Sequence, residues 1–167
     1  MADKNRPTID LQPNTFDLIC LGLVIISIIY IISYVLLGFD ELPVRIPTHF
    51  NIEGQPDSFG SKFSIVWILL LEIGLSILLY IGSRFPHKHN YLIEITPHNA
   101  RRVYGLSVSM MHAVNLCITL FFSYLVLMTI RIAHGQSNDL SNFAVLYLIG
   151  GLTLIVIIFL LKVSKSK

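Results

Sequence analysis

Hydrophobic residues are gathered in four long, continuous runs that are separated by shorter polar segments. The runs cover residues 18–39, 63–82, 103–130 and 140–161. A helix needs about 20 apolar residues to cross the hydrocarbon core of a bilayer, and each run is long enough. Because polar residues do not alternate with apolar ones, the runs favour helices over barrel strands. The pattern predicts an all-α, polytopic membrane protein, an antiparallel bundle of four transmembrane helices formed as a single domain by residues 1–167.

The composition agrees with this class. Only 13% of the residues are charged and 54% are hydrophobic, whereas a soluble domain has about 25% charged residues. So few charges cannot cover a water-facing surface, which excludes a disordered chain, a nucleic-acid-binding module and a cytosolic enzyme. The expected partner is the lipid bilayer, and nothing in the composition indicates a cofactor. Cys20 and Cys117 both lie inside apolar runs, where buried thiols are expected instead of a disulfide.

Lysine and arginine are distributed unevenly between the two ends of the predicted bundle. Nine of the 12 fall in the two tails and in the loop between the second and third runs, and three fall in the other two loops. Positive residues in short loops favour the cytoplasmic side of a membrane. We therefore expect both termini in the cytoplasm and the loop 40–62 outside it.

The loop 40–62, between the first two runs, is rich in turn-forming and polar residues. Pro43 and Pro47 favour extended backbone before them, and glycines supply positions that can take a positive φ. We therefore expect an ordered extracytoplasmic loop instead of a flexible tether. Its candidate recognition residues are His49, Asn51, Gly54, Asp57 and Lys62.

Two interpretations of these side chains remain open. In the first, they are turn formers, caps and interfacial anchors. In the second, His49 and Asp57 face inward over the mouth of the bundle and bind a ligand, a metal or a peptide. A His and an Asp eight residues apart are only a weak metal signal, so no metal ligand is assigned.

The same loop resembles a known family. The pattern Pro-x-x-Ile-Pro-x-His-Phe-Asn-x-x-Gly-x-x-Asp, followed by Gly-Ser-Lys, covers residues 43–62. It is similar to SdpI-like bacterial membrane proteins, whose N-terminal unit is a domain of unknown function. The resemblance implies a four-helix unit with a functional outer loop in a bacterial plasma membrane. It also implies immunity to a toxin and signalling, and no catalytic residues come with it.

Polar residues also form a seam inside the second and third runs. Glu72 and Ser76 lie one helical turn apart, and His112 and Asn115 share a helix face in the third run. Glu72 is about 15 Å into its run, near the bilayer midplane, where an isolated charge is costly. We expect Glu72 to be protonated, paired or facing a wet cavity, and to lie level with His112 or Asn115.

Three functions compete for these features. The first is immunity, sensing or protection at the membrane, with the outer loop contacting a peptide or protein. The second is a small ion- or proton-coupled transporter or channel that uses Glu72 and His112. The third is an intramembrane metal-dependent hydrolase using His49, Glu72 and His112. The seam also fits a purely structural role as polar contacts between helices. The sequence leaves assembly into a homo-oligomer open.

Overall fold

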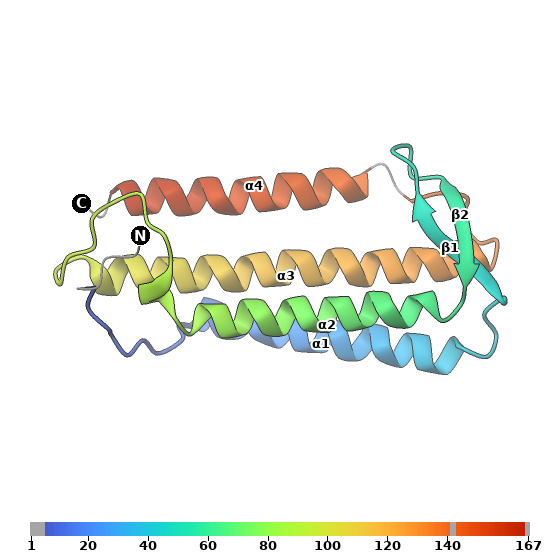
Figure 1. The fold of residues 1–167 in the computed structure, drawn as a ribbon, viewed down its shortest axis with the longest axis horizontal. Helices are drawn as coiled ribbons and strands as arrows, with labels where there is room; N and C mark the ends of the chain where they lie inside the picture. The colour runs from blue at the N-terminus through green and yellow to red at the C-terminus, as the bar shows by residue number, and fades with distance from the viewer. Residues whose placement is uncertain (1–5, 141–142, 166–167) are drawn as a thin grey trace.

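Four long helices dominate the computed structural model, which describes residues 6–140 and 143–165. Helices α1 (Thr15–Gly38), α2 (Ser64–Ser83), α3 (Ala100–Ala133) and α4 (Phe143–Ser164) lie side by side, and each reverses the direction of the one before it (Figure 1). All four are long and apolar enough to cross a membrane. The predicted four-helix membrane fold is therefore confirmed.

The helices differ slightly from the predicted runs at their ends. Helix α1 begins three residues before the run 18–39, because Asn14 and Asp17 form a capping box that satisfies its first N–H groups. Helix α3 likewise begins three residues before the run 103–130 and ends three residues after it. Helix α4 begins at Phe143 and not at residue 140, and it extends to Ser164.

Helix α3 is the centre of the bundle. Helices α1, α2 and α4 each pack along it, whereas α1 and α2 make only a minor contact with each other (Figure 1). Most of the buried polar side chains of the bundle belong to α3. At about 50 Å, from a rise of 1.5 Å per residue, α3 is longer than a bilayer core is thick.

The predicted ordered loop 40–62 contains a feature that an all-α description leaves out. Strands β1 (Arg45–Phe50) and β2 (Pro56–Ser61) pair as an antiparallel hairpin with irregular register around His49. The hairpin lies at the end of the bundle opposite the two termini (Figure 1). A short 3₁₀ turn, η1 (Pro86–Lys88), follows α2 at the termini end.

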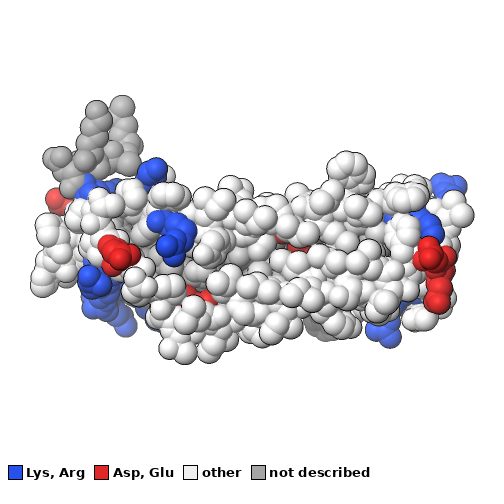
Figure 2. Space-filling model, turned by 90° about the horizontal axis from the view of Figure 1, so that it is seen from below, with Lys and Arg blue, Asp and Glu red and all other residues white. Residues whose placement is uncertain are grey.

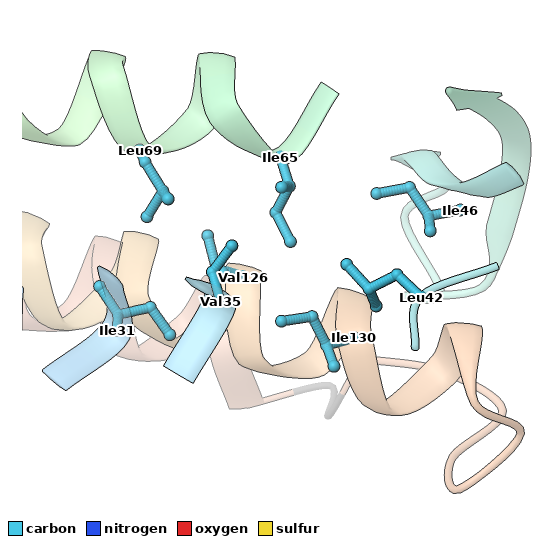
Figure 3. Packing of buried hydrophobic residues seen from close by; sticks show 8 residues of the cluster. All are labelled: Ile31, Val35, Leu42, Ile46, Ile65, Leu69, Val126 and Ile130. Atoms are coloured by element: carbon cyan, nitrogen blue, oxygen red, sulfur yellow. The ribbon is translucent and has the colours of Figure 1, made fainter. Parts of the chain in front are cut away.

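A cluster of buried aliphatic side chains joins the hairpin to the bundle (Figure 3). Ile46 of β1 and the preceding Leu42 are 1% and 5% exposed and extend the core beyond the helices. Their neighbours come from all three inner helices: Ile31 and Val35 of α1, Ile65 and Leu69 of α2, and Val126 and Ile130 of α3. Burial of such side chains contributes about 1.5–3 kcal/mol each, so the hairpin is seated firmly.

The outer surface of the bundle is apolar. Leucines such as Leu37, Leu78 and Leu146 are more than 60% exposed in the isolated molecule. Figure 2 shows charged residues gathered at the two ends, with a largely uncharged band between them. Such a surface requires lipid around it, so the protein is a multi-pass membrane protein.

Candidate functional site

The tip of the hairpin is fixed to the loop between α3 and α4. Gly54 has a φ of +79°, a conformation that glycine adopts without strain. Its carbonyl accepts a hydrogen bond of 2.8 Å from the Leu140 N–H, and a Cβ at this position would lie 2.6 Å from the Leu140 carbonyl oxygen. Gly54 therefore provides both the turn and the room for this close approach.

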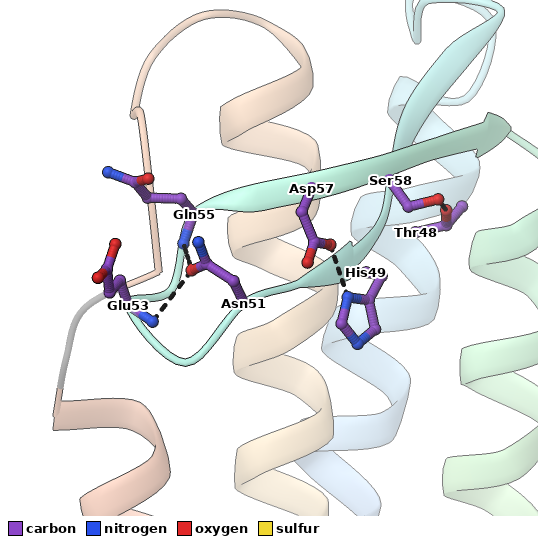
Figure 4. Close-up of polar contacts among 7 residues, drawn as sticks. All are labelled: Thr48, His49, Asn51, Glu53, Gln55, Asp57 and Ser58. Atoms are coloured by element: carbon purple, nitrogen blue, oxygen red, sulfur yellow. Dashed lines mark hydrogen bonds and ion pairs between the residues drawn. The ribbon is translucent and has the colours of Figure 1, made fainter.

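Asn51 holds the same turn from within. Its side-chain oxygen accepts hydrogen bonds from the N–H groups of Glu53 (3.0 Å) and Gln55 (2.9 Å) (Figure 4). Asparagine commonly stabilises turns in this way. These contacts agree with the interpretation of Asn51 as a turn former.

Lys62 connects the end of the hairpin to the end of α1. Its Nζ donates a hydrogen bond of 2.9 Å to the Phe39 carbonyl and lies 4.6 Å from the centroid of the Phe39 ring. Phe39 is the C-cap of α1, where carbonyls lack helical partners and a positive charge is favourable. Lys62 thus caps the C-terminus of α1 and attaches the end of the hairpin to it.

His49 and Asp57 differ from these residues because their side chains are open to solvent. His49 Nδ1 lies 2.6 Å from Asp57 Oδ1, and the two side chains are 69% and 43% exposed (Figure 4). We expected in one interpretation that both side chains face inward over the mouth of the bundle. The structure contradicts this, because both are exposed to solvent. The pair instead stands on the surface of a firmly held hairpin.

Glu72 lies in the bundle, 1% exposed, and its partner was not predicted. Its Oε1 accepts a hydrogen bond of 2.8 Å from the Ser123 hydroxyl, which lies 3.0 Å from the Ser27 hydroxyl. A hydroxyl has one proton, so Ser27 is the donor of the second bond. In the described part of the chain, Glu72 Oε2 is buried without a hydrogen-bond partner.

Glu72 therefore does not pair with His112 or Asn115 as expected, because α2 and α3 are shifted along each other relative to the prediction. Asn115 Nδ2 donates a hydrogen bond of 3.2 Å to the Ser76 carbonyl, and the Thr119 hydroxyl donates one of 3.5 Å to Asn115 Oδ1. Ser123 lies about 16 Å further along α3 than His112. The predicted seam residues Glu72, Ser76, His112 and Asn115 are all buried. The α3 partner of Glu72, however, lies two or more helical turns beyond the residues expected to pair with it.

His112 instead lines a cavity of about 270 Å³ at the termini end of the bundle. It is 6% exposed, and its ring lies 6.3 Å from that of Tyr80 on α2. Asp17, which sequence reasoning missed, lines the same cavity and is 3% exposed. The Asn-x-x-Asp spacing that begins α1 is the sequence signal that could have found it.

The three side chains named for a metal-dependent hydrolase are not brought together. His49 is in the hairpin, and His112 lies about 27 Å of helical rise from Ile130, which packs under that hairpin. Glu72 lies between these levels. In residues 6–140 and 143–165 no three His, Cys, Asp or Glu side chains gather into a metal site.

The loop between α2 and α3 is folded against the helices by His89. Its Nδ1 lies 2.7 Å from the Ser107 hydroxyl and its Nε2 lies 3.1 Å from the Gly82 carbonyl, so it joins α3 to the end of α2. Tyr91 beside it donates a bond of 2.8 Å to the Pro86 carbonyl. Burial raises the pKa of Tyr91 to about 12.

Comparison with known proteins gives a match for the first part of this fold. Residues 18–73 match a family described as a domain of unknown function (DUF1648), and the match covers all but the first three residues of α1, the hairpin and the first half of α2. An uncharacterized protein of Archaeoglobus fulgidus is 35% identical over 76 residues, which are 44% of this chain and 40% of that protein. The chain thus aligns with less than half of this relative. No solved structure matches significantly.

The fold defines a small helical membrane protein, and its residues 18–73 are similar to the DUF1648 family. The matched segment ends one residue after Glu72, so it includes the hairpin pair and the buried acid. Helices α3 and α4 lie outside it.

Proposed function

We propose that this protein recognises a peptide or protein at the outer face of a bacterial plasma membrane, and that it protects or signals for the cell through the hairpin. Both termini then lie in the cytoplasm, as the excess of Lys and Arg at that end favours. The similarity of residues 43–62 to SdpI-like proteins supports a role in immunity or sensing.

The observation that carries this proposal is the solvent-exposed His49–Asp57 pair on a hairpin that is otherwise fixed. The hairpin backbone is held at three points: the buried Ile46, the Gly54–Leu140 contact and the Lys62–Phe39 contact. A surface that is already ordered loses little entropy when it binds a partner. The pair itself adds little stability because it is exposed, so recognition explains it better than folding does.

Exposed apolar side chains of the same hairpin region fit a polypeptide partner. Ile52 at the hairpin tip is fully exposed, and Val44 and Phe59 are 80% and 47% exposed. Exposed apolar groups are typical of protein interaction surfaces. The partner would place apolar side chains on these residues and a polar or charged group on the pair.

The test is protection of living cells. Cells that express the full chain are exposed to a panel of membrane-depolarising peptide toxins, and a voltage-sensitive dye reports the membrane potential. We expect protection against at least one toxin, and a loss of at least 10-fold in protective potency in His49→Ala and Asp57→Asn.

Glu53→Gln is the matched control, because Glu53 is an exposed acid of the same hairpin whose carboxylate is not part of the pair. It should protect like the unmodified chain. Equal protection by all variants would remove the pair from the mechanism, and no protection against any toxin would contradict the proposed role.

A second candidate function is proton or ion transport through Glu72. It is favoured by one observation: near the Ser123 and Ser27 hydroxyls, Glu72 Oε2 is buried and has no hydrogen-bond partner among the described residues. Buried acids in membrane proteins often mark ion or proton pathways. Proton flux into proteoliposomes should then fall at least 10-fold in Glu72→Gln with the fold intact. Equal flux in Glu72→Gln, or no flux above protein-free liposomes, would leave the seam with a structural role.

A further inference from the structure

The cavity at the termini end has a polar floor that the helices themselves do not satisfy. His112 is buried and makes no hydrogen bond within the described residues, although its ring lines the cavity. A buried imidazole nitrogen usually has a hydrogen-bond partner, because leaving it unpaired costs free energy. Its position beside Tyr80 therefore points to a group that enters the cavity.

Asp17 places a negative charge at the same floor. Its Oδ2 accepts a bond of 3.1 Å from the Asn14 N–H and its Oδ1 one of 2.6 Å from the Ser109 hydroxyl. Within residues 6–140 and 143–165, no Lys or Arg forms an ion pair with it. Each carboxylate oxygen has lone pairs for a further donor, so Asp17 can still accept a bond from a cation.

The exposed part of the cavity lining carries both signs of charge, Asp10 and Arg84. Arg84, the C-cap of α2, lines the cavity and is exposed. The N-terminus of α1, which could otherwise attract an anion, is already occupied by the Asp17 carboxylate. An anionic group would therefore be held by Arg84 at the mouth and not at the floor.

We propose that this cavity binds a small zwitterion, with its ammonium group between Asp17 and His112 and its anionic group on Arg84. The ammonium donates to the Asp17 carboxylate and to the free imidazole nitrogen, and the Tyr80 ring lies alongside. The volume of about 270 Å³ is below the roughly 300–1,000 Å³ typical for drug-sized ligands, so the ligand is small. This site is at the opposite end from the hairpin and does not depend on the function proposed above.

The probe is phosphoethanolamine, titrated into the purified full chain in detergent by calorimetry. Ethylammonium carries only the cation and inorganic phosphate only the anion, so each should bind at least 10-fold more weakly. Asp17→Asn and Arg84→Gln should each weaken phosphoethanolamine at least 10-fold. Phosphate that binds as tightly as phosphoethanolamine, or a probe set that shows no saturable binding, would overturn the proposal.

A glycine provides a variant that removes no polar contact. Gly105 of α3 lines the cavity, and a Cβ there would meet no atom within 4 Å. Gly105→Leu should therefore fill the space and abolish binding without loss of fold. Gly74→Leu is the matched control, because Gly74 has equal room on α2 but does not line the cavity. Unchanged binding in Gly105→Leu, with the helical circular dichroism of the unmodified chain, would also overturn the site.

The same chemistry is available from a free metabolite or from a lipid headgroup. Repeating the titration in nanodiscs with and without phosphatidylethanolamine separates these sources. Loss of phosphoethanolamine binding only in the discs with that lipid supports the site and identifies the headgroup as its occupant. Unchanged binding in both discs supports the site and identifies a free molecule.

Discussion

The contact between Gly54 and Leu140 makes a sharp prediction about how the hairpin is held. Gly54→Ala adds a Cβ where the Leu140 carbonyl oxygen is 2.6 Å away, so the hairpin tip must move. It also forces an alanine into a φ of +79°. Gly135→Ala is the matched control, because Gly135 has a φ of +70° but no atom within 4 Å of its Cβ position.

The magnitudes follow from these two differences. A left-handed conformation costs an L-residue roughly 1–2 kcal/mol, and both variants bear this cost. Moving the tip also breaks the hydrogen bond of 2.8 Å between the Leu140 N–H and the Gly54 carbonyl, which contributes about 0.5–1.5 kcal/mol. We therefore expect Gly54→Ala to lower the free energy of unfolding by about 1.5–3.5 kcal/mol, which is about 0.5–1.5 kcal/mol more than Gly135→Ala does.

The assay is unfolding by sodium dodecyl sulfate in mixed micelles. Trp67, the only tryptophan, lies in the first turn of α2 next to the hairpin, so its fluorescence reports on this end of the bundle. Hydrogen exchange at the Leu140 amide should also be faster in Gly54→Ala than in Gly135→Ala. Equal losses of stability in the two variants, with equal Leu140 exchange, would refute the idea that this contact seats the hairpin.

Three further predictions concern other contacts. Lys62→Met should lower the free energy of unfolding by about 1 kcal/mol in the same assay, because the Phe39 carbonyl loses its donor, and Lys62→Arg should lose less. Glu72→Ala should cost about 2 kcal/mol or more by leaving a cavity and removing the acceptor of the Ser123 proton, whereas Glu72→Gln keeps an acceptor and should cost under about 1 kcal/mol; equal losses would contradict this bond. Tyr91, with its pKa raised to about 12 from the ordinary 10, should stabilise the fold fully below pH 10 and less as the pH rises to 12. In absorbance at 295 nm, the number of late-titrating tyrosines should be lower by one in Tyr91→Phe than in the unmodified chain.

The four spans could be predicted because the hydropathy of a membrane helix is a local property of the sequence. The same is true of the ordered loop, whose prolines and glycines restrict the backbone residue by residue. The hairpin inside it was not predicted, since Pro43, Pro47 and Pro56 make its sequence unlike an ordinary strand. The pairing becomes favourable because Ile46 is buried against helices that are distant in sequence.

The partner of Glu72 depends on the relative height of two helices, which the sequence does not state. Asn115 bonds to the Ser76 carbonyl, so about two turns of α3 extend past the end of α2. His89 folds the connecting loop back along this extension. Glu72 therefore meets Ser123 and not His112. Asp17 was missed for a simpler reason, because it lies one residue outside the apolar run that begins at Leu18.

The central position of α3 determines the order in which this fold can form. Residues 18–73 contain most of α1, the hairpin and half of α2, yet two of the side chains beneath the hairpin, Val126 and Ile130, come from α3. During synthesis, α1 and α2 therefore enter the membrane before the helix that they both require has been made. In this chain, the hairpin therefore gains its complete set of buried neighbours only after α3 has been inserted.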